Sequence, residues 1–401
     1  MSQAAIPKIE RLLEKRFGGT ARFVPSGRLG IVIACEAFMQ CGDGVAMITP
    51  LCEVVAFAVY AAGMRPVFID SRTTSPNIDV DLLQSVDKRH INGVIATNLF
   101  GIPADLPRLQ RLCRDRGWTL VEDCAQVLES HVRGQQVGTF GDVAIFSFGK
   151  YFDEMGAAVI CRDRKRLHRV EQLIQRYTAP PALSARIRAR AVQMLRRSKA
   201  GRLENYARTV LRALLPRSTS PRRRATDTRL PLSVDQFLTD AQAPDPLAGM
   251  DGYLSERGTK PYRQLPPSAR LERLLEKLLD WDRLVLSVRE ANRKLRYQCP
   301  LVDLRLPDGV EPCYLRVPYL TGRRDIIAEL AWRTEHVRTE NIYEPPLSAY
   351  LPVAAFRDVR RFPERDSRWS REILPVNALH TEALLRAIQR SIPPQARPAQ
   401  A

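Results

Sequence analysis

The chain of 401 residues lacks any run of about 18 or more uninterrupted apolar residues, which argues against a transmembrane helix. Its first residues, Met1 to Lys8, also lack the basic and then apolar pattern of a secretory signal peptide. None of its eight cysteines forms a CxxC pair, and several fall inside apolar segments. We therefore expect reduced, buried thiols in a cytoplasmic protein, with neither a disulfide framework nor a metal site.

Acidic residues are scarce in one stretch, and that stretch carries most of the net charge. Residues 186–224 hold 13 Arg or Lys and one acid, Glu204, and so contribute 12 of the 18 net positive charges. A cationic helix here could lie on an anionic membrane surface. It could also be a solvated helical hairpin without a partner, which we favour, or a dimer contact. Nucleic acid is disfavoured, because Tyr206 is the one aromatic residue of the stretch available for base stacking.

Strand and helix patterns alternate through the first 162 residues. The expected helices are 5–16, 27–40, 53–62 and 105–116, and the expected strands are 45–49, 66–70, 93–98, 119–123, 142–148 and 157–161. These strands are nearly continuous apolar runs, which is typical of a parallel sheet covered by helices on both faces. The alternation predicts an α/β sheet with right-handed crossovers.

The chain divides by composition into five segments. We expect a large α/β domain at 1–162, a basic helical insert at 163–230, and a helical connection at 231–296 with an amphipathic helix at 271–295. Residues 297–392 form a smaller α+β domain, with a strand-like segment at 313–318 and helices at 326–334 and 381–392. Residues 393–401 are rich in Pro and Ala and predict a frayed tail.

Polar residues gather where one expected strand ends. Glu122 and Asp123 close the strand at 119–123, and Gln126 follows three residues later. Open α/β sheets bind ligands at the carboxyl ends of their strands. Asp123 could therefore hydrogen-bond a protonated ring nitrogen, and Gln126 could reach an oxygen of the same ring. The alternative is that Asp123 is the N-cap of a following helix.

Three further segments could complete a cofactor site. The backbone at Gly27 and Arg28 opens a long helix whose free N–H groups could bind a phosphate, although Ser26 can also be a plain N-cap. Ser147 is polar within an apolar strand, so its hydroxyl needs a partner such as a phosphate or a backbone carbonyl. Lys150 could form a Schiff base with an aldehyde in a desolvated crevice, or could be an ordinary surface lysine.

In order and spacing these segments resemble the DegT/StrS family of sugar aminotransferases, which are pyridoxal-phosphate (PLP) enzymes of fold type I. The resemblance covers about residues 8–162 and resumes weakly near the C-terminus. The motifs that carry it are Ser26-Gly-Arg, Gly42-Asp-Gly-Val, Pro66-Val-Phe-Ile-Asp, Asn98-Leu-Phe-Gly-Ile-Pro-Ala-Asp, Val121-Glu-Asp-Cys-Ala-Gln, Gly138-Thr-Phe-Gly-Asp and Phe146-Ser-Phe, with weaker matches at Ile342-Tyr-Glu-Pro-Pro-Leu and Ile373-Leu-Pro-Val-Asn.

The resemblance implies a three-layer α/β sandwich around a mostly parallel sheet, with PLP as the cofactor. It implies that Asp123 holds the pyridine nitrogen, that Gln126 sits beside the ring oxygen, and that the phosphate is bound by Gly27, Arg28 and Ser147. It further implies a homodimer that transfers an amino group from an amino acid, which we expect to be glutamate, to a nucleotide-linked keto-sugar. The product would enter polysaccharide or glycosylated-metabolite biosynthesis.

The sequence departs from the family pattern at the catalytic centre. The Schiff-base lysine of the family stands four residues after the second Phe of Phe-Ser-Phe, and this chain has Phe152 there. Lys150 comes two residues earlier and could face the same side if the backbone stays extended. Cys52 replaces an aromatic residue that stacks on the ring, and 261–267 lacks the Asn that helps bind phosphate across the dimer.

These departures leave alternatives to transamination. A catalytically degenerate paralogue could bind PLP or a sugar nucleotide, or serve as a partner subunit, without turnover. Altered PLP chemistry such as dehydration, with another residue taking over the proton transfer, is a third possibility.

Overall fold

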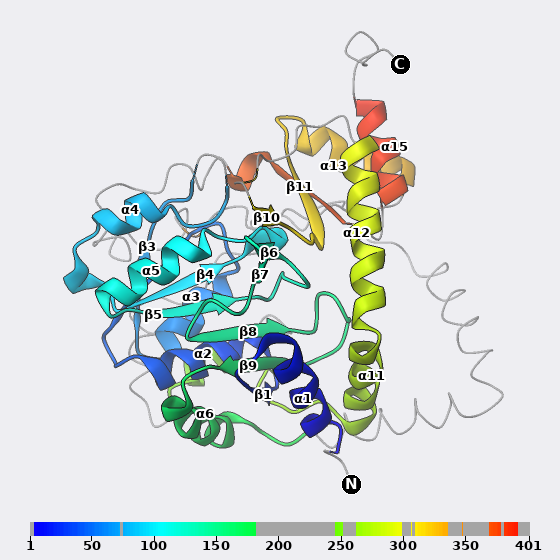
Figure 1. Ribbon diagram of the computed structural model, residues 1–401. Helices are drawn as coiled ribbons and strands as arrows, with labels where there is room; N and C mark the ends of the chain where they lie inside the picture. The colour runs from blue at the N-terminus through cyan, green and yellow to red at the C-terminus, as the bar shows by residue number, and fades with distance from the viewer. Residues whose placement is uncertain are drawn as a thin grey trace, which may run out of the picture.

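A seven-stranded sheet lies between two layers of helices in the computed structural model (Figure 1). The structure describes residues 4–72, 75–181, 245–251, 262–298, 306, 309–335, 347, 369–377 and 381–391. The basic stretch 186–224, the motif at 342–346 and the tail at 393–401 lie outside these residues, so the predictions made for them stay predictions. Within the described residues, no helix is both long and apolar enough to cross a membrane.

The order of the strands across the sheet is β1-β9-β8-β5-β4-β2-β3. The strands are β1 (Thr20–Val24), β2 (Gly44–Met47), β3 (Arg65–Phe68), β4 (Gly93–Thr97), β5 (Thr119–Asp123), β8 (Val143–Ser147) and β9 (Ala157–Cys161). From β8 to β3 every neighbouring pair is parallel, whereas β9 runs antiparallel to both β8 and β1. The predicted α/β fold with a mostly parallel sheet is confirmed.

The antiparallel direction of β9 follows from the length of the connection before it. Only residues 148–156 separate β8 from β9. A parallel crossover needs a dozen or more residues, so this loop can only return the chain antiparallel. The sequence interpretation also missed β1, which comes directly after Gly19 and pairs with β9 at the edge of the sheet.

Helices cover both faces of the sheet, as the apolar strands require. One layer contains α2 (Gly27–Phe38), α3 (Glu53–Ala61) and α6 (Arg164–Tyr177), and the other contains α1 (Ile6–Phe17), α4 (Val80–Ser85) and α5 (Leu106–Arg116). A Cβ added at Gly30 would stand 3.1 Å from Ile145 Cγ2, so a glycine here lets α2 lie close on β8. On the opposite face, Phe17 of α1 packs on Phe146 with ring centroids 4.1 Å apart.

Two successive helices replace the single helix expected at 271–295. They are α11 (Ser268–Leu279) and α12 (Trp281–Gln298), and the break is at Asp280, whose φ of −99° and ψ of 18° leave helical geometry. Glu129 attaches α12 to the sheet domain, because its carboxylate accepts hydrogen bonds from Trp281 Nε1 (3.3 Å) and from Arg16 of α1 (2.7 Å).

The C-terminal part is a small α+β unit. Strand β11 (Arg316–Leu320) pairs antiparallel with β12 (Ile373–Asn377), beside α13 (Arg324–Glu335) and α15 (Thr381–Ser391). A second small sheet, β10 (Val310–Glu311), β6 (His131–Val132) and β7 (Gln135–Gln136), joins this part to the loops of the large sheet. The division of the chain into five segments stays a prediction. Helix α6 falls within the predicted basic insert at 163–230 and packs on α2 of the large domain.

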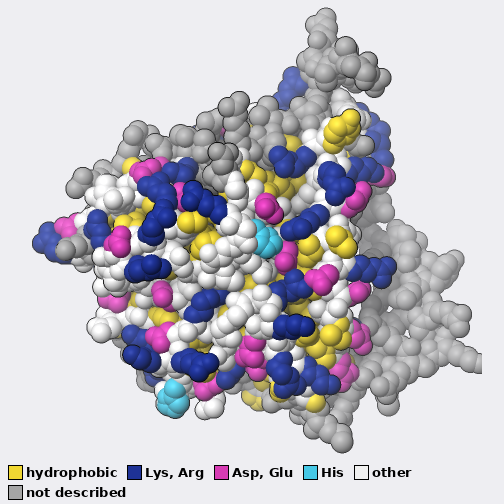
Figure 2. All heavy atoms as spheres, viewed as in Figure 1, with side chains coloured by type: hydrophobic (Ala, Val, Ile, Leu, Met, Phe, Trp, Pro, Cys, Tyr) yellow, Lys and Arg dark blue, Asp and Glu magenta, His cyan; other side chains and the backbone are white. Residues whose placement is uncertain are grey.

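Charged side chains of both signs are interspersed on the face shown in Figure 2. The described part of this face therefore carries no single large basic patch. Most of the net positive charge of the chain lies in residues 186–224, which are outside the described residues.

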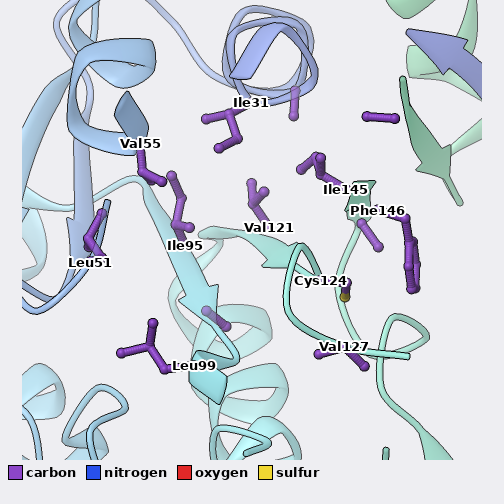
Figure 3. Close-up of a cluster of buried hydrophobic side chains, with 14 of the residues drawn as sticks. Ile31, Leu51, Val55, Ile95, Leu99, Val121, Cys124, Val127, Ile145 and Phe146 are labelled. Atoms are coloured by element: carbon purple, nitrogen blue, oxygen red, sulfur yellow. The ribbon is translucent and has the colours of Figure 1, made fainter. Parts of the chain in front are cut away.

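The core under α2 and α3 fixes the orientation of the strand ends. Figure 3 shows Ile95 of β4, Val121 of β5 and Ile145 of β8 pointing into one apolar cluster with Ile31 of α2 and Val55 of α3. Residues two apart in a strand share a face. The last residues of these three strands therefore point to the same side of the sheet as the cluster.

Candidate active site

Three polar side chains end three neighbouring strands on the face covered by α2 and α3. They are Thr97 of β4, Asp123 of β5 and Ser147 of β8. Thr97 pairs with Asp123 in the parallel register, and Asp123 pairs with Ile145, two residues before Ser147. Asp123 and Ser147 were predicted from the sequence, whereas Thr97 was missed. A polar residue next to the end of the strand expected at 93–98 was the signal that could have found it.

Asp123 is a buried carboxylate held by a tight turn. It is 6% exposed, and its Oδ1 accepts a hydrogen bond from Ala125 N at 2.9 Å. Burial raises the pKa of Asp123, while the Ala125 N–H and the positive charge of Lys150 lower it. Residues 124–130 contain no helix, so the N-cap explanation does not apply. A cation placed beside this carboxylate would offset the cost of burying it.

Glu122 points to the other face and has a structural task. Its carboxylate accepts hydrogen bonds from the backbone N–H groups of Gly138 (2.8 Å), Phe140 (2.7 Å) and Gly141 (2.6 Å). The turn between β7 and β8 is thereby attached to β5. Of the two adjacent acids, only Asp123 lies on the same face of the sheet as Thr97 and Ser147.

Gln126 supports a neighbouring loop. Its Oε1 accepts a hydrogen bond from Phe100 N at 3.0 Å, where Phe100 has a φ of +59°. This bond stabilises a left-handed turn that a non-glycine residue adopts only at a cost. The backbone carbonyl of Gln126 accepts from Tyr151 Oη at 2.6 Å. The predicted contact of Gln126 with a ring oxygen stays a prediction.

The first turn of α2 offers two backbone donors beside Ser147. Ser26 is the N-cap: its Oγ accepts from Leu29 N at 3.3 Å and its carbonyl accepts from Gly30 N at 3.0 Å. The N–H groups of Gly27 and Arg28 have no acceptor within the helix, as at any helix start. A Cβ added at Gly27 would lie 3.8 Å from Ser147 Oγ, which shows how closely the two segments approach. Ser26 can therefore cap α2 while the N–H groups of Gly27 and Arg28 bind a phosphate.

The side chain at the position where the family has its lysine packs in an aromatic cluster. Phe152 is 5% exposed, and its ring centroid lies 5.1 Å from that of Trp281 and 6.2 Å from that of Phe148. Lys150 is exposed on the turn after β8 and lies close enough to Asp123 and Cys52 to lower the pKa of both. Of the two candidate positions, only residue 150 faces the strand ends.

Helix α11 holds the loop that carries Lys150. Glu154 has a side chain only 5% exposed, and its Oε1 accepts from Arg273 Nε and Lys277 Nζ, both at 3.1 Å. Lys277 Nζ also donates to the backbone carbonyl of Phe152. These bonds attach the short loop at 149–156 to α11. In this conformation the Phe152 side chain is buried and Lys150 is exposed to solvent.

Replacing Phe152 with alanine tests whether its side chain is a core residue that does not contact the cofactor. We expect the free energy of unfolding to fall by about 3–5 kcal/mol, as for other buried phenylalanines, in urea titrations followed by circular dichroism. We expect the folded fraction to bind PLP as the wild-type protein does, because the ring packs on Trp281 and Phe148 rather than beside Asp123 and Ser147. A Phe152→Lys variant that carried covalently bound PLP at residue 152 would contradict it.

Cys52 stands at the N-cap position of α3, on the same side as Lys150. Burial and Glu53 raise the pKa of the Cys52 thiol to about 11, although Lys150 and Arg28 lower it. The thiol is therefore neutral at physiological pH, and it supplies a small polarizable contact where an aromatic ring was expected.

Segment 262–267 makes its contacts within the chain. Arg263 NH1 donates to Asp245 (2.7 Å) and Asp251 (2.8 Å), and Arg263 Nε donates to Tyr177 O (3.2 Å). The neighbouring Tyr262 is buried near Arg28, whose pKa is lowered by burial and raised by Cys52, Tyr262 and Glu53. Two of the three guanidinium nitrogens of Arg263, NH1 and Nε, thus bind partners of their own chain.

Part of this chain is similar to known proteins. A model of the DegT/DnrJ/EryC1/StrS aminotransferase family matches residues 11–173. A UDP-N-acetyl-3-dehydro-alpha-D-glucosamine 3-aminotransferase of Acidithiobacillus ferrooxidans is 32% identical over 125 residues, 31% of this chain and 34% of that protein. A dTDP-3-amino-3,4,6-trideoxy-alpha-D-glucose transaminase of Micromonospora megalomicea subsp. nigra is 31% identical over 208 residues, 48% of this chain and 54% of that protein.

The fold comparison extends over more of the chain than these alignments do. The crystal structure of DesV from S. venezuelae superposes with a TM-score of 0.65 at 19% identity, covering 96% of this chain and 87% of that one. This likeness shows a shared fold. The sequence alignments, in contrast, span 34% and 54% of the two curated relatives.

PLP is the cofactor of this family, and the residues at the strand ends fit it. The two free N–H groups of α2 and the Ser147 hydroxyl suit a phosphate. The buried Asp123 carboxylate suits a protonated ring nitrogen, which would supply the positive charge that its burial calls for. Residues 11–173 therefore form a domain of the DegT/DnrJ/EryC1/StrS aminotransferase family.

Proposed function

We propose that this protein transfers an amino group from an amino acid, glutamate, to the keto group of a nucleotide-linked sugar, with PLP as the cofactor. The observation that carries the proposal is the convergence of Asp123, Ser147 and the first turn of α2 at one edge of the sheet. The relatives above, which by name act on UDP- and dTDP-linked sugars, support the substrate class. We place the product in polysaccharide or glycosylated-metabolite biosynthesis.

The binding part of the mechanism belongs to α2 and β8. Gly27 and Arg28 donate their backbone N–H groups to the phosphate, and the positive end of the helix dipole strengthens both bonds. The Ser147 hydroxyl gives a third donor from the neighbouring strand. Because these groups belong to regular elements, they orient the ligand without a loop rearrangement.

Asp123 and Lys150 carry the chemical part. Bound PLP supplies an electron sink for the C–H bond that breaks next to the amino group. Asp123 keeps the ring nitrogen protonated through a buried, charge-assisted hydrogen bond. Lys150 would hold the cofactor and would move the proton at the substrate carbon. Lys150 is exposed in the single chain, so we also propose that a second copy of the chain covers it in a homodimer.

An amino-transfer assay tests the proposal. The full chain would be incubated with PLP, glutamate and a panel of nucleotide-linked keto-sugars, and amino-sugar formation followed by mass spectrometry. We expect one 2-oxoglutarate for each amino-sugar formed. An enzyme that binds PLP but transfers no amino group to any member of the panel would refute transamination of these substrates.

A second candidate is a protein that binds PLP or a sugar nucleotide without transamination. The observation that favours it is the burial of Phe152 at the position of the family's lysine, with Lys150 exposed two residues earlier. Borohydride reduction followed by peptide mapping separates the two candidates. A reduced PLP adduct on Lys150 supports the enzyme, whereas PLP that stays removable by dialysis supports the binding protein.

A further inference from the structure

The hydroxyl of Thr97 is a buried polar group at the end of β4. Thr97 is 7% exposed, and among the described residues its Oγ1 finds no hydrogen-bond partner. Burial of a hydroxyl without a partner costs free energy, so such groups are uncommon and often mark a site that binds something else. Thr97 ends β4, at the edge of the sheet where Asp123 ends β5.

The strand register aims this hydroxyl toward the same space as Asp123. Thr97 and Asp123 are directly paired in the parallel ladder, so their side chains leave the sheet on one face. Figure 3 shows the preceding residues of that face, Ile95 and Val121, in the apolar cluster beneath α2 and α3. The two polar side chains therefore stand next to each other on top of this cluster.

Two neighbouring amides already make hydrogen bonds: both ends of the Asn98 amide and the Oε1 atom of Gln126 bind backbone groups. Asn98, the next residue, donates from Nδ2 to the carbonyls of Ala96 and Asp123 (both 3.4 Å) and accepts from Ala104 N at 2.9 Å. Gln126, which the resemblance assigns to the ring oxygen, receives the Phe100 N–H on its Oε1. Thr97 is thus the neutral donor beside Asp123 whose hydroxyl is unused.

We infer that Thr97 Oγ1 donates a hydrogen bond to the phenolic oxygen of bound PLP, the atom that the resemblance assigns to Gln126. This inference rests on the proposed cofactor site. The ring of PLP carries two polar positions besides its aldehyde and phosphate arms, the nitrogen and the phenolic oxygen. With the nitrogen assigned to Asp123, the phenolic oxygen is the acceptor left for an adjacent hydroxyl.

Thr97→Val is the decisive substitution, because valine keeps the shape of threonine and removes the hydroxyl. In the full chain without PLP we expect thermal unfolding at the wild-type temperature or above, since an unpartnered polar group is lost. We expect PLP affinity in equilibrium dialysis to fall about 10-fold, the scale of one hydrogen bond. The absorbance maximum of bound PLP should also shift, because the hydrogen bond at its phenolic oxygen changes.

Two further variants control for effects on folding. Thr178 at the end of α6 is a second threonine with a buried Oγ1 and no partner among the described residues. Thr178→Val makes the same chemical change outside the strand ends, so PLP affinity should stay as in the wild type. Thr97→Ser keeps the hydroxyl and should bind PLP within about 2-fold of wild type.

The outcomes separate this inference from the proposed function. Wild-type affinity and an unshifted spectrum in Thr97→Val would overturn the inference and leave the PLP site intact. Equal losses of affinity in Thr97→Val and Thr97→Ser would overturn it as well, since the hydroxyl would then not be the cause. Failure of the wild-type protein to bind PLP at all would overturn the proposed function and this inference together.

Discussion

Replacement of Lys150 by alanine is expected to abolish covalent attachment of PLP and to lower amino transfer by about 10²- to 10⁴-fold, the range for loss of a positioned proton-transfer group. Lys150 lies near Asp123 and Cys52, whereas the family's lysine position is occupied by Phe152 in an aromatic cluster. The adduct would be measured by borohydride reduction and intact mass, and the rate with the best nucleotide-sugar of the panel.

Lys165→Ala is the matched control for this substitution. Lys165 is an exposed lysine in the first turn of α6, so its removal changes the net charge equally but leaves the strand ends untouched. We expect full activity and a full PLP adduct. If the reduced adduct persisted in Lys150→Ala, another lysine would be the attachment point and the assignment of residue 150 would be wrong.

Replacement of Asp123 by asparagine is expected to act in opposite directions on activity and on the stability of the protein without PLP. Activity should fall by about 10²- to 10³-fold, as when one preorganised electrostatic group is removed, because asparagine cannot keep a ring nitrogen protonated. Without PLP the variant should be more stable than the wild type at neutral pH, since burial raises the pKa of the Asp123 carboxyl.

The raised pKa of Asp123 also predicts how the stability difference between Asp123→Asn and wild type changes with pH. A carboxyl whose pKa is raised by folding favours the folded state below the unfolded pKa, and this contribution is lost as pH rises through the folded pKa. The stability advantage of Asp123→Asn over wild type should therefore grow with pH. Urea titrations at several pH values measure it, and the comparison with wild type removes the parallel contribution of Glu122, whose pKa burial also raises.

Saturating PLP should remove the advantage of Asp123→Asn, because a protonated ring nitrogen then partners the wild-type carboxylate. Asp115→Asn, at an exposed position on α5, is the control and should change neither activity nor the pH dependence. An Asp123→Asn variant that is less stable than wild type without PLP would mean that Asp123 contributes mainly a structural hydrogen bond to Ala125.

Features that depend on local sequence could be predicted well. The strands at 119–123 and 157–161 occur at the predicted residues, and the helix at Gly27 begins where Ser26 was expected to cap it. Apolar runs and caps are properties of neighbouring residues, so the chain itself specifies them. The candidate roles of Asp123 and Ser147 followed from where those runs end.

Features that depend on contacts between distant segments could not be predicted in the same way. The side on which Phe152 lies is set by Trp281 and by Lys277, which are more than 120 residues away in the chain. The task of Gln126 is set by the left-handed turn at Phe100, and the break at Asp280 divides a sequence that reads as one amphipathic helix.

The sequence by itself determined the α/β architecture, the strand that ends at Asp123, and the helix that starts at Gly27. Only the tertiary structure decided which residue of the short loop, 150 or 152, faces the crevice, and only the strand pairing brought the Thr97 hydroxyl beside Asp123. The physical reason is that a strand or a cap forms from residues a few positions apart. The partner of a buried side chain, in contrast, is set by packing between elements that are distant in the chain.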